Sequence, residues 1–206
     1  MAATKAPRTM KQDDVIKTRY VCDATLSPDG KLVAYVLSEV TGTGEEERQQ
    51  TAIYLVPVKG GKPRRLTQGK GNDSNPAFTA DGQAIVFLST RDKLPQIYRI
   101  SISGGEAVPL TSMKQGAGPF EMSPDRKRIA FAATKASTPS RGKDDHVVVD
   151  RAWYRFDPMP GYLGDVQQAA FILPLDTKAS EPTPVTDFAG IVSSIAWSPD
   201  GKRLAV

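Results

Sequence analysis

Two arginines that flank aromatic residues are the side chains best suited to bind a ligand in this sequence. Arg151 and Arg155 enclose Trp153 and Tyr154 in a long segment between two apolar stretches. A guanidinium binds a carboxylate through two parallel hydrogen bonds, and aromatic rings line pockets for apolar side chains. These four residues are therefore the candidates for substrate binding, with a carboxylate or other oxygens and an apolar group as the parts that they would recognise. In the structural alternative, the arginines stack on the rings and pair with neighbouring aspartates.

A complete catalytic site is absent from the sequence. His146 is the only histidine and lies in a polar stretch, where a surface position is the ordinary interpretation. No Gly-x-Ser-x-Gly motif accompanies it, so a serine-histidine pair of the usual kind has no nucleophile. The sequence predicts no catalytic residue, and we expect this chain alone to have no catalytic activity.

Other polar clusters indicate solvated loops. Glu45–Glu47 forms a charge run in a Gly/Thr-rich stretch. Asn72–Asp73 and Asp144–His146 lack the spacing of a metal site and are interpreted as turn residues. Cys22 is the only cysteine, which excludes an intrachain disulfide, and we expect it to be a small core residue. The sequence therefore predicts no metal and no cofactor.

The composition is that of an ordinary globular chain. Of 206 residues, 39% are hydrophobic and 24% are charged, and the net charge is +4. The basic clusters at 62–65 and 126–128 are interpreted as solvated turns, and no basic stripe interleaved with aromatics indicates nucleic acid. No apolar run is long enough to cross a membrane. We expect a cytoplasmic protein that binds neither nucleic acid nor membrane.

Internal repetition identifies the elements that must position these residues. A turn precedes an apolar strand four times, and a Leu-Thr or Val-Thr pair ends three of the units. Thr67 and Thr111 lie 44 residues apart, and Asp81 and Asp125 are separated by the same interval. A period near 44 residues is typical of a four-stranded propeller blade. The fold predicted is all-β, an incomplete β-propeller of about three and a half four-stranded blades.

Turn chemistry explains why the same residues recur. Proline presets φ for the first central position, and glycine accepts the left-handed conformation that leads into the next strand. The turns are Ser27–Gly30, Ala80–Gly82, Ser123–Asp125 and Ser198–Gly201. Arg126 occupies the position of the glycine in the third turn. That turn is therefore either strained or of a different type.

The repeat also sets the domain boundaries. Residues 1–20 form an N-terminal arm with a short helix over about 10–17, which a capping box at Thr9–Gln12 indicates. Residues 21–206 form the partial propeller. Its units are 21–67, 68–111, 112–186 with an insert at 134–165, and an incomplete unit at 187–206. A ring takes at least four blades. We therefore expect a piece of a longer polypeptide whose open edge favours self-association.

The turn and insert sequences resemble one family. Leu26–Lys31, Ile195–Lys202 and the recurring Ile-Tyr, Gly-Gly and Leu-Thr pairs resemble the propeller of prolyl oligopeptidase family serine peptidases. The insert sequence, Arg151–Asp157 with Gly161–Leu163, is similar to the acylaminoacyl-peptidase branch. The resemblance implies a C-terminal α/β-hydrolase domain in the same polypeptide that carries a Ser-Asp-His triad.

Two functions remain open, because TolB-like propellers share the turn sequence. In the first, the chain is the substrate-gating propeller portion of a serine exopeptidase or oligopeptidase that acts on short peptides. Acylaminoacyl-, dipeptidyl- and carboxypeptidase-type specificities all remain open. In the second, it is a TolB-like propeller that binds a protein partner and has no enzymatic role.

Overall fold

The computed structural model describes residues 9–10, 14, 17–69, 71–137, 166–175, 181–187 and 191–206. The regular elements found there are strands, apart from one short 3-10 helix, η1 (Gly44–Glu46). The predicted helix over 10–17 is not among these elements, and most of its residues lie outside the described part. Within the residues described, no helix is long and apolar enough to cross a membrane.

The strands form three four-stranded antiparallel sheets and the start of a fourth. Within each four-stranded sheet, strands that are consecutive in the chain pair with one another. Blade 1 contains β1 (Tyr20–Leu26), β2 (Leu32–Thr41), β3 (Arg48–Pro57) and β4 (Arg64–Arg65). Blade 2 contains β5 (Asp73–Phe78), β6 (Ala84–Ser89), β7 (Gln96–Ser101) and β8 (Val108–Pro109). Blade 3 contains β9 (Ala117–Met122), β10 (Arg128–Ser137), β11 (Val166–Pro174) and β12 (Thr183–Pro184). The fourth sheet begins with β13 (Ala196–Trp197) and β14 (Leu204–Ala205).

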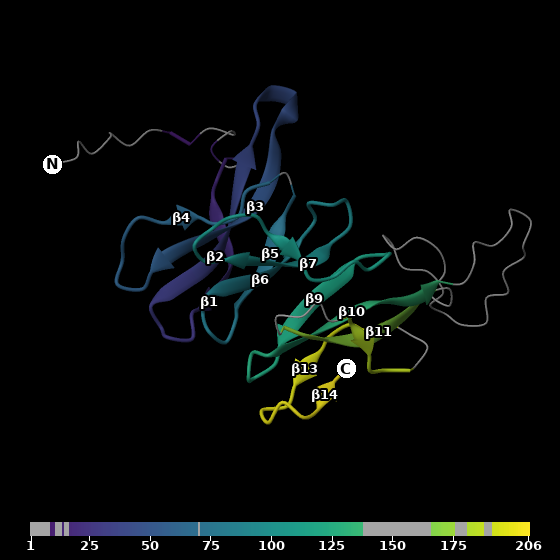
Figure 1. Cartoon of the computed structure of the whole chain (residues 1–206). Helices are drawn as coiled ribbons and strands as arrows, with labels where there is room; N and C mark the ends of the chain where they lie inside the picture. The colour runs from purple at the N-terminus through teal and green to yellow at the C-terminus, as the bar shows by residue number, and fades with distance from the viewer. Residues whose placement is uncertain are drawn as a thin grey trace, which may run out of the picture.

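The successive sheets pack face to face, as the propeller prediction requires. Figure 1 shows blade 1, blade 2, blade 3 and the β13–β14 hairpin following one another in chain order. One buried apolar cluster joins blades 1 and 2, and a second joins blades 2 and 3. The all-β propeller architecture is confirmed. Strand β10 continues to Ser137, which places the beginning of the predicted insert inside a strand.

The two clusters repeat one arrangement. In blade 2, Phe87 and Tyr98 lie 6.0 Å apart between ring centroids and face blade 1. In blade 3, Phe131 and Phe171 lie 5.7 Å apart and face blade 2. All four are buried under aliphatic side chains of the preceding blade. Burial of such rings contributes a large share of the packing energy of each interface.

Antiparallel order gives each blade two distinct edges. We call the edge with the β1–β2, β5–β6 and β9–β10 turns the turn edge. The opposite edge carries the connections β2–β3, β6–β7 and β10–β11 and the links between blades, and we call it the linker edge.

The turn edge is built from one hydrogen-bonded turn. At the first turn, the Ser27 hydroxyl donates to Asp29 Oδ1 at 2.7 Å and accepts the N–H of Leu32 at 2.9 Å. Asp29 Oδ1 also accepts the N–H of Lys31 at 3.1 Å. The same contacts recur in the turns of Thr79–Asp81, Ser123–Asp125 and Ser198–Asp200. In each turn the hydroxyl hydrogen bond is the main cause that lowers the pKa of the aspartate.

Arg126 keeps this turn at the cost of an unusual backbone conformation. Its φ is 56°, close to the 68°, 66° and 65° of Gly30, Gly82 and Gly201. The N–H of Arg126 donates to the Ser123 carbonyl at 2.8 Å, as the glycines do in their turns. Of the two alternatives for this turn, the structure therefore shows the same turn type with a strained residue.

Threonines hold the short fourth strand of each blade. Thr67 Oγ1 accepts the N–H of Ile53 at 3.0 Å, and Thr111 Oγ1 accepts that of Ile97 at 2.9 Å. Thr186 repeats the contact with Ala170. The hydroxyl thus replaces a carbonyl as the partner of a strand N–H. This substitution explains why each unit ends on threonine.

Candidate functional site

A row of charged side chains follows the linker edge, one in each blade. Glu39, Arg91 and Lys135 occupy equivalent positions, because their spacings of 52 and 44 residues are those of the turn aspartates. Each of the three forms an ion pair. We call Glu39, Arg91, Lys135 and their partners the linker-edge row.

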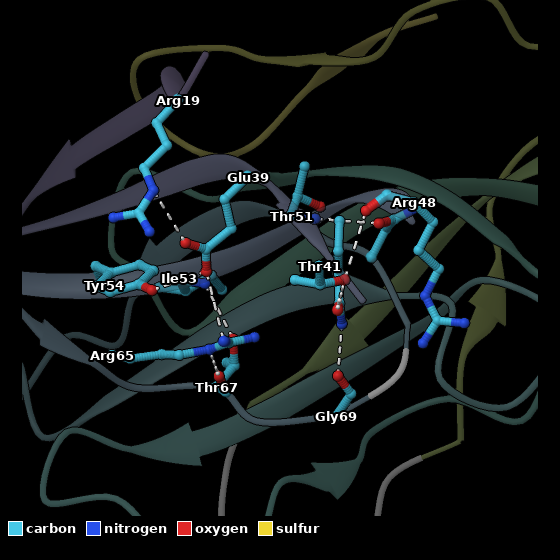
Figure 2. A network of polar contacts seen from close by, with 12 residues as sticks. Arg19, Glu39, Thr41, Arg48, Thr51, Ile53, Tyr54, Arg65, Thr67 and Gly69 are labelled. Atoms are coloured by element: carbon cyan, nitrogen blue, oxygen red, sulfur yellow. Dashed lines mark hydrogen bonds and ion pairs between the residues drawn. The ribbon is translucent and has the colours of Figure 1, made fainter. Parts of the chain in front are cut away.

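Glu39 is the centre of the cluster in blade 1 (Figure 2). The Tyr54 hydroxyl donates to Glu39 Oε1 at 3.0 Å, and Arg65 Nη1 lies 3.4 Å from the same oxygen. Arg19 Nε lies 3.6 Å from the other carboxylate oxygen, Oε2. Arg65 Nε in turn donates to the Thr67 carbonyl at 3.0 Å. Side chains from three strands and from the residue before β1 therefore meet at one carboxylate.

Burial sets the electrostatics of this cluster. The Glu39 side chain is 11% exposed, whereas that of Arg19 is 70% exposed. Burial, followed by the hydrogen bond to Glu39, raises the pKa of Tyr54. A buried carboxylate is stable only when donors and cations replace its water. Tyr54 and Arg65 supply them from inside the protein, and Arg19 is the partner that faces solvent.

Blade 2 places a cation at the equivalent position. Arg91 Nη2 lies 3.2 Å from Asp73 Oδ1, and Arg91 Nε donates to Ser89 Oγ at 2.9 Å. The Arg91 guanidinium also lies 4.8 Å from the centre of the Tyr98 ring. The Tyr98 hydroxyl donates to Asp92. Burial, then this hydrogen bond, raises the pKa of Tyr98 to about 12.

Blade 3 continues the row to the point where the long insert joins the sheet. Lys135 Nζ lies 2.6 Å from Asp187 Oδ1, an exposed pair. Ser137 pairs with Val166, so the segment 138–165 leaves and re-enters blade 3 at the linker edge. The predicted substrate-binding residues lie in that segment, outside the described residues: Arg151, Trp153, Tyr154 and Arg155. The same holds for His146.

The charged side chains of the linker-edge row are paired within the chain. Within the described ranges, no group of three or more His, Cys, Asp or Glu residues could hold a metal ion. The linker-edge row presents paired carboxylates and cations, which recognise charged groups by hydrogen bonds and Coulomb attraction.

Several of these residues were misinterpreted from the sequence. Asp73 was expected in a turn, but it is buried and begins β5. Arg65, Arg126 and Arg128 were expected in solvated turns. Instead, Arg65 binds Glu39 and both other arginines donate to the carbonyls of neighbouring sheets. The one signal in the sequence was the charged residue that recurs at the position of Glu39, Arg91 and Lys135 in the repeat, and it does not identify their partners.

The structure contradicts the interpretation of Cys22 and confirms that of Glu45–Glu47. Cys22 was expected in the core, which is wrong, because the residue is exposed. It lies where the pairing of β1 with β2 shifts, between Val21 and Asp23, on the first strand of the first sheet. Glu45–Glu47 is exposed, as the solvated interpretation predicted, and Glu47 pairs with Lys17 at 3.5 Å.

Comparison with known proteins gives peptidase relatives over nearly the whole chain. "Uncharacterized peptidase YuxL" of Bacillus subtilis is 28% identical over 93% of this chain and 30% of its own length. "Dipeptidyl-peptidase 5" of Porphyromonas gingivalis is 27% identical over 90% of this chain and 29% of its own length. The chain therefore spans less than a third of these relatives.

Solved structures and shorter matches agree on the fold. An acylaminoacyl peptidase in complex with a chloromethyl ketone superposes with a TM-score of 0.64 over 94% of this chain and 28% of the other, at 20% identity. The "Tol-Pal system protein TolB" of Bordetella pertussis is 46% identical over only 27% of this chain and 13% of its own length. The resemblance to the propeller portion of prolyl oligopeptidase family peptidases is thus confirmed as a similarity.

One family model matches most of the sequence. It is the TolB beta propeller domain, and it covers residues 5–148. The repeated turns, the threonine-held fourth strands and the stacked sheets are the structural counterparts of this match. The chain belongs to the TolB beta propeller domain family.

Proposed function

We propose that this chain is the propeller portion of a serine peptidase that acts on short peptides. The observation that carries the proposal is the extent of the matches, since two proteins named as peptidases align with nine-tenths or more of the chain. The proposed role is to admit and orient peptides, while catalysis belongs to an α/β-hydrolase domain of the same polypeptide. Acylaminoacyl-, dipeptidyl- and carboxypeptidase-type activities fit this role equally.

A second candidate function is a TolB-like module that binds a protein partner. The observation that favours it is the 46% identity to TolB, which is higher than that of either peptidase. That match covers about a quarter of the chain, however, whereas each peptidase alignment covers nine-tenths or more of it. We therefore rank the peptidase role first.

Peptide binding is proposed at the linker edge. The segment that carries Arg151 and Arg155 joins blade 3 there, beside the linker-edge row. The two arginines would hold a peptide carboxylate or backbone oxygens, and Trp153 and Tyr154 would receive an apolar side chain. A paired acidic site would instead favour capture of a peptide amine.

Peptide hydrolysis by the longer polypeptide tests the proposal. We expect Arg151→Ala and Arg155→Ala each to raise KM for short peptides about tenfold with kcat little changed, because binding in the ground state and transition state weakens together. The matched control is Arg141→Ala, which removes the same charge elsewhere in the segment. Unchanged KM in both variants would reject the binding role of these arginines. Absence of any peptidase activity in the longer polypeptide would reject the peptidase role itself.

We also propose that the protein works in a reducing compartment, the cytoplasm. The support is the composition, since a single cysteine gives no disulfide framework of the kind common in small secreted domains. Cell fractionation with an antibody against the chain tests the location. Recovery in a secreted or periplasmic fraction would contradict it.

A further inference from the structure

A hollow of about 580 Å³ lies between blades 2 and 3 at the turn edge. The turn of Thr79–Asp81 forms one wall, and the turn that continues from Asp125 into β10 forms the other. Four cationic side chains reach it: Arg99, Arg126, Lys127 and Arg128. Pro174 and Leu175 add apolar surface. This volume lies within the range of pockets that hold small organic ligands, roughly 300–1,000 Å³.

The repeat supplies an internal comparison for this hollow. Blades 1 and 2 form an equivalent hollow of about 330 Å³ between the turn of Ser27–Asp29 and the turn of Asp81–Gln83. Ile102 there occupies the position of Leu175. No cationic residue lines this first hollow. The repeat offset of 44 residues gives the equivalent residues one blade earlier. For Arg99, Arg126, Lys127 and Arg128 they are, in that order, Leu55, Gly82, Gln83 and Ala84, none of which is charged. The propeller scaffold itself therefore does not require them.

The cations of the second hollow form no close ion pair with a described carboxylate. None of the four lies within 4.0 Å of a carboxylate in the described part of the chain, although Asp81 and Asp125 line the same space. In both aspartates, Oδ1 is engaged by the turn hydroxyl and a backbone N–H. Four cations and two aspartates leave an excess of positive charge, which favours an anion.

Two of these arginines also have structural contacts. Arg126 Nη1 donates to the Phe78 carbonyl at 3.0 Å, and Arg128 Nη2 donates to the Gly201 carbonyl at 2.9 Å. The Arg128 guanidinium also lies 5.0 Å from the centre of the Trp197 ring, so both arginines are held in place by contacts of the fold. The side chains of Arg99 and Lys127 donate no hydrogen bond to a described residue, so they are the groups most available to a ligand. Arg126 is also the only non-glycine residue with a left-handed backbone at this position among the four described turns, which costs conformational energy.

We propose that this hollow binds an organic carboxylate that carries an apolar group, as an acidic residue of a peptide does beside an aliphatic one. Arg99 and Lys127 bind the carboxylate, and Pro174 and Leu175 contact the apolar part. An inorganic anion would satisfy the cations and leave the apolar wall in water, so the ligand needs both parts. The site lies at the edge opposite the insert, and it does not depend on the proposed peptidase role.

Binding of a capped peptide to the 206-residue chain tests the site. The probe is acetyl-Gly-Leu-Glu-Leu-Gly-amide, measured by titration calorimetry at low salt, with the glutamine version of the same peptide as the reference. We expect the glutamate peptide to bind at least tenfold more tightly than the glutamine peptide, and the difference to shrink at 0.5 M salt. Inorganic phosphate alone should compete only weakly.

Two variants and one control locate the binding. Arg99→Gln should weaken glutamate-peptide binding about tenfold, and Lys127→Gln about three- to fivefold, because the lysine is more exposed. Lys31→Gln is the matched control, since Lys31 occupies the same turn position as Lys127 and lies outside the hollow. Equal affinity for the two peptides would overturn the proposal. So would equal weakening by Lys31→Gln and Lys127→Gln, or phosphate competition as strong as that of the peptide.

Discussion

Arg126 shows at the residue scale how one side chain departs from a repeated turn without breaking it. Three of the four turns use glycine at φ near 65°, and the third keeps that backbone angle with arginine. The Arg126 guanidinium reaches the Phe78 carbonyl of blade 2, which offsets part of the strain. The two effects can be separated by substitution.

Substitution of Arg126 gives the first prediction. Arg126→Ala keeps the left-handed backbone and loses the hydrogen bond, whereas Arg126→Gly loses the hydrogen bond and relieves the backbone. We expect the alanine variant to unfold with a free energy about 1 kcal/mol lower than that of the glycine variant. Urea unfolding of the two variants measures this difference directly. Equal stabilities would show that φ at this position carries no strain.

The pKa of Tyr98 gives the second prediction. Burial and the Asp92 hydrogen bond raise this pKa from 10.0 to about 12, so the folded chain holds the phenol proton more tightly than the unfolded chain. The resulting stabilisation is fully present below about pH 10 and is lost as the pH rises toward 12. The stability difference between the wild type and Tyr98→Phe should therefore shrink over that range.

Urea unfolding at several alkaline pH values checks the Tyr98 prediction. Tyr35→Phe is the control, because it removes a hydroxyl that has no hydrogen bond to a described residue. A difference between wild type and Tyr98→Phe that stays constant from pH 9 to 12 would contradict the linkage.

At the element scale, a threonine hydroxyl extends the pairing of the short fourth strand in each blade. Thr67 is fully buried, and its Oγ1 accepts the N–H of Ile53. Thr67→Val keeps the shape and leaves a buried N–H without a partner, which should cost about 1–3 kcal/mol of unfolding free energy. Thr67→Ser retains the hydroxyl and should cost less. Thermal or urea unfolding of both variants tests this, and equal losses would indicate that packing of the methyl group decides the stability.

The elements that were predicted from sequence are those that the repeat specifies. Turn residues and threonine endings recur at fixed spacing, and each has a local physical cause, so they could be predicted without the fold. Glu39, Asp73 and Arg91 could not, because their partners come from other strands and only pairing brings them together. The positions of Arg151 and Arg155 stay predictions, since no described residue fixes where their segment points.

For the whole molecule, stability comes from packing between blades. Phe87 is fully buried between blades 1 and 2. Its equivalent in blade 1, Tyr35, stacks on Tyr54 at 5.6 Å on the side of blade 1 that faces away from blade 2, and it is only partly buried. The aromatic pair of blade 2 is thus enclosed between two blades, whereas the equivalent pair of blade 1 is partly exposed.

This difference gives the fourth prediction. Phe87→Ala should lower the unfolding free energy by about 3–5 kcal/mol, as expected for a large side chain removed from a packed core. Tyr35→Ala should lower it by about 1–2 kcal/mol, since less surface returns to water. Chemical denaturation of the 206-residue chain compares the two. Similar losses would mean that the outer face of blade 1 is covered in solution, for example by a second copy of the chain.

The consecutive order of strands in every blade has a kinetic consequence. Each sheet closes through neighbouring segments, so its contacts are local in sequence and the entropy lost on closure is small. Blade 1 can therefore form while later residues are still being synthesised. Blade 3 is the exception, because β10 meets β11 only after the chain has passed through residues 138–165. We therefore expect completion of blade 3 to be slower than completion of blade 1 or blade 2.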